Sequence, residues 1–246
     1  MRTAGSLSGK VALITGGSRG MGREMALAFA REGADVIIAS RKIDACKAVA
    51  AGVRALGCRA CALAAHTGDW GQVETLADAA WAEWGRVDIL VNNAGMSPVE
   101  PSSVSTSEAL FDKVIAVNFK GPFRLAALLG TRMRDAGGGS IINVSSLGAK
   151  NPQPGIIPYA GAKAALNAMT IGLAREFAPH VRVNTISPGM FATDIAKHWV
   201  DTDRMQAAIP MQRFGQPHEI VGVALYLASD ASSYTTGADI AVGGGI

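Results

Sequence analysis

A tyrosine and a lysine stand four residues apart in the segment Tyr159-Ala160-Gly161-Ala162-Lys163. This segment opens a stretch of helical periodicity, and residues four apart share one face of a helix. A phenol is protonated near neutral pH because its pKa is about 10. An adjacent ammonium group favours the phenolate and lowers that pKa. The pair therefore predicts general acid–base chemistry at the hydroxyl group of Tyr159.

A glycine-rich turn near the amino terminus predicts a phosphate site. An apolar run ends in the turn TGGSRGMG, residues 15–22, and a helical pattern begins there. Glycine permits a sharp turn and lets a bare backbone approach a pyrophosphate, whose charge is stabilised by the N–H groups at the helix start. The order G-x-x-x-G-x-G differs from the commoner G-x-G-x-x-G, but the physical requirement is the same. The predicted dinucleotide contacts of this turn are Gly16, Ser18, Arg19, Gly20, Met21 and Gly22.

The end of the second expected strand bears on the choice of cofactor. An acidic residue at this place would bind the adenosine ribose hydroxyls and repel a 2′-phosphate. This chain has Ser40 and Arg41 there, and Arg19 can reach them from the glycine turn. Such a pocket suits an anion, so the sequence favours NADP(H) over NAD(H). The alternative is that both arginines are merely solvated.

The elements that must position these residues follow an α/β pattern. Apolar runs without alternation, typical of parallel strands covered on both faces, take turns with longer helical patterns. This predicts a single doubly wound Rossmann-type domain over residues 1–246, with a seven-stranded parallel sheet and helices on both faces. The expected strands are Val11–Thr15, Val36–Ser40, Arg59–Ala64, Ile89–Asn92, Ile141–Val144, Arg182–Ile186 and Asp239–Val242. The expected helices are Met21–Arg31, Asp44–Leu56, Trp70–Trp84, Ser107–Asn118, Phe119–Ala136, Tyr159–Phe177 and Pro217–Ala228.

One connection, residues 190–213, is longer than an ordinary loop between a strand and a helix. Long insertions in compact domains are usually lids or binding loops, so we expect a substrate lid here. The alternative is a pair of short helices that pack on the core or on a neighbouring subunit.

Composition argues against several other classes of protein. The residues are 49% hydrophobic and 17% charged, which is typical of a well-buried α/β enzyme. The formal net charge is only +3 and the basic residues are scattered, so we expect no nucleic-acid partner. No apolar run is long enough to span a membrane, and Met1–Lys10 holds no signal-like apolar region, so we expect a cytoplasmic protein.

Cys58 and Cys61 form a CxxC pattern, which can indicate a zinc or redox site. They fall in or beside an expected strand, where positions three apart face opposite sides of the sheet. No second pair of ligands accompanies them, so we expect packing and no metal.

Five motifs are similar, in order and approximate spacing, to those of the short-chain dehydrogenase/reductase family: TGGSRGMG, NNAG, NVSS, YAGAK and SPG. The resemblance covers essentially the whole chain. It implies an NADP(H)-dependent oxidoreductase that moves a hydride between nicotinamide and a carbonyl or secondary alcohol. It implies Tyr159 as the acid/base, Lys163 as the residue that holds the nicotinamide ribose, and Ser146 as the residue that orients the substrate oxygen. Asn118 matches an asparagine that holds a water between the lysine and a proton relay.

The resemblance also places residues around the rest of the cofactor. Asn92, Ala94 and Gly95 match the segment beside the adenosine half, and Thr193, after Pro188 and Gly189, matches a position near the nicotinamide amide. Many relatives have an acid near the adenine, where this chain has His66 and Thr67. The change weakens a hydrogen bond to the adenine amino group, although His66 can still pair or stack there. Near the carboxyl terminus, Val242-Gly243-Gly244-Gly245 departs from the family's frequent Asp-Gly-Gly.

The substrate and the assembly are less closely defined by the sequence. The expected pocket is mostly apolar, which suggests a carbonyl on an aliphatic or cyclic skeleton: a 3-oxoacyl thioester, a simpler ketone or a steroid-like ring. The resemblance implies a homotetramer with contacts through residues 119–136 and 159–177. Alternatives are an NADP-binding sensor or scaffold without turnover, and a related enzyme of dehydration or epimerisation. The candidate substrate residues, besides Ser146 and Tyr159, are Met96, Leu147, Pro154, Ile156, Met190, Phe191 and Trp199.

Overall fold

Seven parallel strands form one sheet in the order β3-β2-β1-β4-β5-β6-β7. The computed structural model describes residues 5–193 and 202–246. The sheet confirms the predicted doubly wound arrangement, in which β2 and β3 lie on one side of β1 and β4 to β7 lie on the other. The strands are β1 (Val11–Thr15), β2 (Asp35–Ser40), β3 (Ala60–Ala64), β4 (Ile89–Asn92), β5 (Gly139–Val144), β6 (Val181–Pro188) and β7 (Asp239–Val242).

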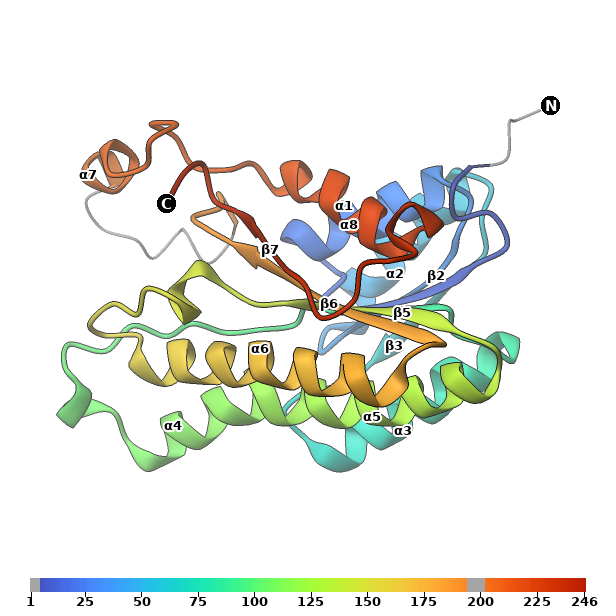
Figure 1. Cartoon of the computed structure of the whole chain (residues 1–246), viewed down its shortest axis with the longest axis horizontal. Coiled ribbons are helices and arrows are strands. Elements are labelled where there is room, and N and C mark those ends of the chain that lie inside the picture. The colour runs from blue at the N-terminus through green and yellow to red at the C-terminus, as the bar shows by residue number, and fades with distance from the viewer. Residues whose placement is uncertain (1–4, 194–201) are drawn as a thin grey trace.

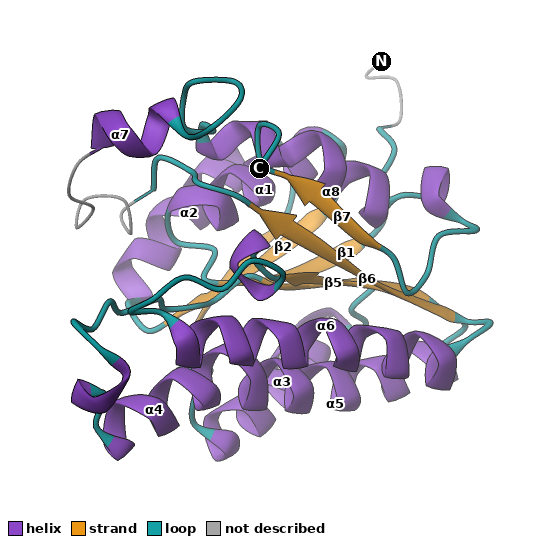
Figure 2. Cartoon of the chain, turned by 60° about the vertical axis from the view of Figure 1, so that its left-hand side comes forward, coloured by secondary structure: helices purple, strands orange, loops and turns teal. Residues whose placement is uncertain are grey.

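Helices cover both faces of the sheet (Figures 1 and 2). One face carries α1 (Gly20–Arg31), α2 (Ile43–Ala55) and α8 (Val221–Ala228). The other carries α3 (Trp70–Trp84), α4 (Glu108–Ile115), α5 (Gly121–Asp135) and α6 (Ile157–Phe177). Short helical turns are η1 (Ser103–Ser105), η2 (Ala116–Lys120), η3 (Leu147–Ala149), η5 (Pro217–Ile220) and η6 (Asp230–Ser232), and α7 spans Thr202–Ala207.

The two faces of the sheet bury two separate clusters of side chains. Along β1, Ala12 and Ile14 pack toward α1, α2 and α8, whereas Val11 and Leu13 pack toward α3, α5 and α6. Successive side chains of a strand point to opposite faces, so both faces of β1 are apolar. The polar residues of the site therefore follow the strands, at their carboxyl ends.

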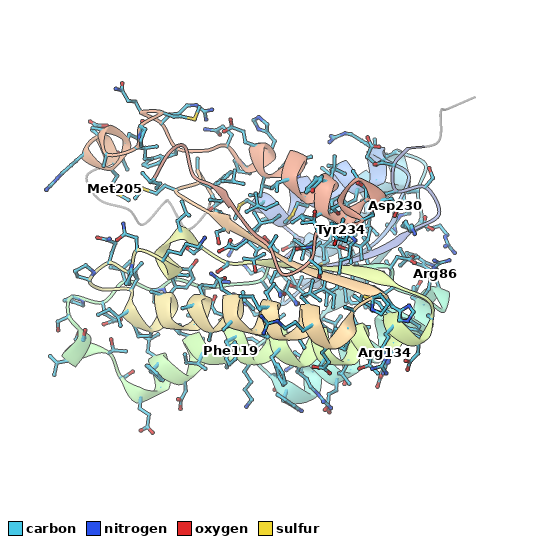
Figure 3. All side chains as sticks on the ribbon, viewed as in Figure 1. Arg86, Phe119, Arg134, Met205, Asp230 and Tyr234 are labelled. Atoms are coloured by element: carbon cyan, nitrogen blue, oxygen red, sulfur yellow. The ribbon has the colours of Figure 1, made fainter. Side chains whose placement is uncertain are left out.

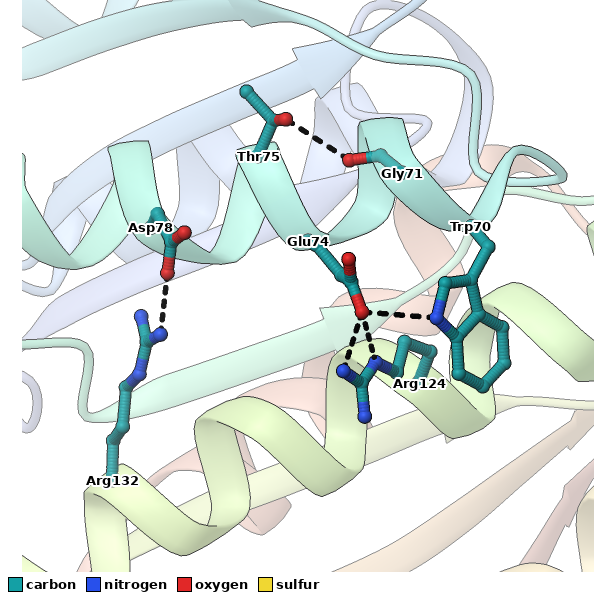
Figure 4. Close-up of polar contacts among 7 residues, drawn as sticks. All are labelled: Trp70, Gly71, Glu74, Thr75, Asp78, Arg124 and Arg132. Carbon is teal, nitrogen blue, oxygen red and sulfur yellow. Dashed lines mark hydrogen bonds and ion pairs between the residues drawn. The ribbon is translucent and has the colours of Figure 1, made fainter.

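Ion pairs join α3 to α5 on the face of the sheet that these two helices cover (Figure 4). Arg124 donates to Glu74 Oε1 through Nε at 3.0 Å, and Trp70 Nε1 donates to the same oxygen at 2.9 Å. Arg132 forms a second pair with Asp78 at 2.5 Å. These contacts fix α5 beside α3, and α5 continues into the segment that holds Asn118.

The main departure from the predicted elements lies between residues 107 and 136. The sequence predicts two helices with a boundary at Asn118, but the helix is continuous from α4 through η2 into α5. The turn η2 is π-helical, and both Ala116 and Gly121 at its ends have right-handed helical dihedrals. A π-helical turn inserts one residue without breaking the helix, and such turns often occur at functional sites. The predicted boundary is therefore wrong.

Residues 190–213 contain α7, and Phe191 forms an isolated bridge with Gly215, just after this segment. Met205 of α7 lies at the end of the molecule opposite Arg86 and Arg134, beyond the carboxyl ends of the strands (Figure 3). Trp199 lies outside the described residues. A lid function for this segment stays a prediction.

The cysteines of the CxxC pattern pack as ordinary thiols. Cys58 Sγ donates to the carbonyl oxygen of Ala30 at 3.1 Å. Burial and the charge of Glu83 raise the pKa of the Cys61 thiol to about 11, so the nucleophilic thiolate is disfavoured. Within residues 5–193 and 202–246, no group of three His, Cys, Asp or Glu side chains could hold a metal ion. No helix in the same ranges is long and apolar enough to cross a membrane.

Candidate active site

The glycine turn lies between the carboxyl ends of β1 and β4, where the strand order reverses and Rossmann-type sheets bind their ligands. Gly16 has a positive φ of 62°, and a Cβ atom there would lie 2.9 Å from Ala94 Cα. A Cβ atom at Gly22 would lie 2.4 Å from the carbonyl oxygen of Gly16. The N-cap of α1 is Arg19, whose side chain does not bond to the first N–H groups of the helix. A glycine turn that leads directly into the start of a helix fits the pyrophosphate of a dinucleotide.

Two residues that the sequence did not single out hold this turn in place. Asn93 Nδ2 donates to the carbonyl oxygens of Thr15, at 2.9 Å, and Gly16, at 3.2 Å. Thr15 Oγ1 accepts from the backbone N–H groups of Asn93 and Ala94, each at 3.1 Å. The second asparagine of NNAG was the available signal. The first, Asn92, is buried and donates to Asn143 Oδ1 at 2.9 Å, so its side chain points into the core.

The predicted adenosine end lies at the carboxyl ends of β2 and β3, where Ser40 pairs with Ala64. Ser40 Oγ lies 3.0 Å from Cys46 Sγ and accepts from the N–H group of Lys42 at 3.3 Å. Arg41 is exposed beside it. His66 Nδ1 accepts from the N–H group of Gly68 at 3.1 Å, which in the neutral imidazole leaves the proton on Nε2.

Tyr159 and Lys163 come together on α6 as the spacing predicts, with Lys163 Nζ 5.8 Å from the centre of the tyrosine ring. Lys163 is buried and donates to the carbonyl oxygen of Val144 at 2.8 Å. Burial lowers the pKa of Lys163 to about 7. Burial also raises the pKa of Tyr159, and a hydrogen bond with Ser146 opposes that rise. The expected lowering of the tyrosine pKa by the ammonium is therefore not found: burial sets the direction of the shift, and the opposing influence is the hydrogen bond with Ser146.

The structure brings Ser146, and not Ser145, to Tyr159. Ser146 Oγ accepts from the N–H group of Gly148 at 3.0 Å, so its hydroxyl hydrogen remains available for donation. Ser145 is buried instead, and its hydroxyl donates to the carbonyl oxygen of Lys163 at 3.2 Å. A hydroxyl that can donate thus lies beside a phenol kept protonated by burial.

Asn118 lies in the π-helical turn and clamps the loop after β4. Its Nδ2 donates to the carbonyl oxygens of Met96 and Val114, both at 2.9 Å, and its Oδ1 accepts from the N–H group of Met96 at 3.2 Å. A Cβ atom at Gly95 would lie 3.0 Å from Asn118 Oδ1 and 3.6 Å from Lys163 Nζ. The sequence predicts that Asn118 holds a water. The structure shows the side-chain amide of Asn118 bonded to backbone groups of Met96 and Val114, so a water would be held by the backbone of Asn118.

The remaining predicted residues fall into two groups. Thr193 lies across from the glycine turn, 3.6 Å from the place of a Cβ atom on Gly20, and Leu147 packs against Gly243 beside the loop after β6. Pro188 ends β6, and a Cβ atom on Gly189 would lie 2.8 Å from Gly243 Cα. Phe191, in contrast, is buried in the core against Gly215.

Comparison with known proteins decides the family. A family model described as Enoyl-(Acyl carrier protein) reductase matches residues 16–246. Dehydrogenase/reductase SDR family member 4 of Homo sapiens is 34% identical over 244 residues, which cover 97% of this chain and 88% of the relative. The chain belongs to the short-chain dehydrogenase/reductase family. It is also 37% identical over 246 residues to the 3-oxoacyl-[acyl-carrier-protein] reductase of Thermotoga maritima, with 98% of each chain covered.

Solved structures of short-chain dehydrogenase/reductases share the whole fold. A putative short-chain alcohol dehydrogenase from Sinorhizobium meliloti superposes with a TM-score of 0.93 at 40% identity, covering 98% of both chains. A blue fluorescent protein from a metagenomic library, in complex with NADPH, has a TM-score of 0.92 at 32% identity and covers 98% of both chains. A 7α-hydroxysteroid dehydrogenase with NADH and 7-oxo glycochenodeoxycholic acid has a TM-score of 0.93 at 33% identity, covering 100% of this chain and 98% of its own. As a member of this family, the chain is an oxidoreductase that acts on CH–OH or C=O groups.

Proposed function

We propose that this short-chain dehydrogenase/reductase reduces a ketone with NADPH, or runs the reverse oxidation, with Tyr159 as its acid/base. The grouping of Ser146, Tyr159 and Lys163 beside Gly95, in the loop that contacts the glycine turn through Ala94, is the observation on which the proposal rests. A bound nicotinamide would supply or accept the hydride at the carbonyl carbon. Tyr159, protonated because burial raises its pKa, donates its proton to the carbonyl oxygen. Ser146 donates a hydrogen bond to that same oxygen and so fixes its position.

Lys163 has two tasks in this proposal. Its ammonium holds the ribose next to the nicotinamide, and it stabilises the phenolate that Tyr159 becomes after donating its proton. The bond from Nζ to the carbonyl oxygen of Val144 holds the ammonium in place, next to Gly95, where an added Cβ atom would lie 3.6 Å from Nζ.

The proton donor gives the direct test. Tyr159→Phe removes only the hydroxyl, so NADPH affinity should stay unchanged while turnover falls about 10²- to 10⁴-fold. The assay is loss of NADPH absorbance over a panel of ketones, including 3-oxoacyl thioesters and steroid ketones. The panel includes 3-oxoacyl thioesters and steroid ketones for two reasons. The candidate substrate residues Leu147, Met96 and Met190 are apolar, and two relatives are named for substrates of these kinds. Wild-type turnover by the phenylalanine variant would disprove the assignment; NADPH binding with no turnover of any ketone by the wild type would favour a sensor.

The preference for NADP(H) rests on Ser40 and Arg41 and on the lack of an acid at the end of β2. Relatives of known structure bind either NADPH or NADH, so the family does not decide. A guanidinium on a 2′-phosphate contributes about 1.5–3 kcal/mol, so Arg41→Ala should weaken NADPH binding about 10- to 100-fold and hardly affect NADH. Thermal shift with both cofactors measures this, with Arg31→Ala, at the far end of α1, as the control. Equal losses of affinity for NADPH and NADH would show that Arg41 does not bind the 2′-phosphate.

A further inference from the structure

A single carboxylate at the start of β7 is bonded to three segments around the active site. Ser187 donates its hydroxyl to Asp239 Oδ1 at 2.5 Å, just before β6 ends. Lys150 Nζ lies 2.8 Å from Asp239 Oδ2, directly after η3. Asn167 Nδ2 donates to the same oxygen at 3.3 Å, one helical turn beyond Lys163 on α6. Asp239 thus connects β6, α6 and the loop that follows Ser146.

β7 contacts η3 at a second point. A Cβ atom on Gly243 would lie 2.3 Å from Leu147 Cδ1, so the leucine packs closely on the backbone just after β7. Lys150 and Leu147 stand at the two ends of η3. The start of β7 therefore supports one end of this short turn and the segment after β7 supports the other.

The position of η3 in turn determines the position of the Ser146 hydroxyl. Ser146 is the N-cap of η3, and its Oγ accepts from the N–H group of Gly148 at 3.0 Å. The N–H group of Ala149 donates to the carbonyl oxygen of Ser146 at 3.0 Å. A shift of η3 would move the hydrogen-bond donors that orient Ser146.

The ion pair of Lys150 with Asp239 is better placed to fix a loop than an ordinary surface pair. The side chain of Lys150 is 53% exposed, but that of Asp239 is only 21% exposed. Surface pairs contribute little when both side chains must be ordered. Here Ser187 and Asn167 already hold the carboxylate. Asn167 makes its bond to Asp239 through Nδ2, and its Oδ1 is buried without a hydrogen-bond partner among the described residues.

We propose that Asp239 is a positioning residue that, through Lys150, holds η3 so that the Ser146 hydroxyl points at the substrate oxygen. The effect on turnover rests on the proposed function, whereas the effect on η3 does not. Small displacements of an orienting group can cost up to about 100-fold in rate.

The first test uses Lys150→Gln, which removes the exposed partner without opening the core. We expect kcat at saturating NADPH to fall about 10-fold. The Kd for NADPH should not change, because the glycine turn is not touched. Lys150→Arg should retain most of the rate, and Lys113→Gln, an exposed lysine on α4, should match the wild type. Asp239→Asn should lower kcat as much as Lys150→Gln, and the double variant should be no slower than either. A normal kcat for Lys150→Gln, or additive losses in the double variant, would overturn the proposal.

The second test does not depend on activity. Amide hydrogen exchange of Gly148, Ala149 and Lys150 reports on η3 itself, because each of these N–H groups is bonded within the turn. Exchange should accelerate in Lys150→Gln and stay unchanged in Lys113→Gln. Unchanged exchange in Lys150→Gln would overturn the positioning role. Faster exchange in a protein that reduces no ketone would retain that role and reject the proposed function.

Discussion

Lys163 is only 3% exposed, and its ammonium donates to the carbonyl oxygen of Val144. Burial lowers its pKa from 10.5 to about 7. Between these two pH values the unfolded chain keeps a proton that the folded protein has lost. The unfolded state binds more protons, so the free energy of unfolding rises with pH across this window.

The Lys163→Met variant should isolate this contribution. The free energy of unfolding of the wild type, minus that of the variant, should increase from pH 7 toward pH 10 by up to about 1.4 kcal/mol per pH unit. Urea unfolding at three pH values within this window measures the difference. Lys113→Met, at an exposed lysine, should give a flat difference. A flat profile for Lys163→Met as well would mean that burial does not shift the pKa of Lys163.

Adjacent polar residues show why the sequence predicted the site in part. Tyr159, Lys163 and Ser146 come together as their motifs predict. Asn92 and Asn93 are chemically identical neighbours, yet the first points into the core and the second holds the glycine turn. Their side chains separate where β4 ends; the sequence predicts that end, but it does not show which of the two side chains faces the core. The tyrosine pKa was unpredictable for a related reason, since desolvation depends on neighbours that are distant in sequence.

Among the elements, the strands were easier to predict than the long helix between residues 108 and 135. The strands β1, β4 and β7 have the predicted bounds, because apolar runs bounded by polar residues are local signals. The π-helical turn η2 spans five residues, too few to shift the helical periodicity of the sequence visibly. The packing that accompanies it lies between Gly121 and Thr67, which are far apart in the chain.

The contact between Gly121 and Thr67 gives a prediction at the level of the elements. A Cβ atom on Gly121 would lie 1.6 Å from the carbonyl oxygen of Thr67, so Gly121→Ala must displace backbone. We expect a loss of about 1–3 kcal/mol in the free energy of unfolding, and weaker cofactor binding because the displaced loop includes His66. Gly222→Ala in α8 is the control, since nothing lies within 4 Å of its Cβ position. Thermal melts with and without NADPH compare the two. Wild-type melting and affinity in Gly121→Ala would contradict the close packing.

The whole molecule exposes an apolar surface on the layer formed by α4, α5 and α6. Phe111 is 46% exposed, Phe123 40% and Ile171 44%. Along α6, the exposed positions before Arg175 hold only small or apolar residues: Ile157, Gly161, Ala164, Ala168, Ile171 and Gly172. Small residues let two helices approach closely, and an uncharged stripe of this length is typical of an interface between subunits. The homotetramer that the family resemblance implies would cover this surface.

The assembly is testable by light scattering on the eluting protein. The wild type should have about four times the chain mass of 25.3 kDa. Ile171→Glu places a charge in the stripe of α6, where burial against another subunit would leave the carboxylate unpaired, so the tetramer should dissociate. The variant should keep its far-UV circular dichroism, because Ile171 is already 44% exposed in the single chain. Val104→Glu, at a residue that is 97% exposed in η1 and is not part of the α6 stripe, should leave the mass unchanged. A wild type that elutes as a monomer at micromolar concentration would reject the tetramer. A tetramer that survives Ile171→Glu would mean that the interface lies on another face. A buried unpaired charge costs more free energy than one such helix contact contributes.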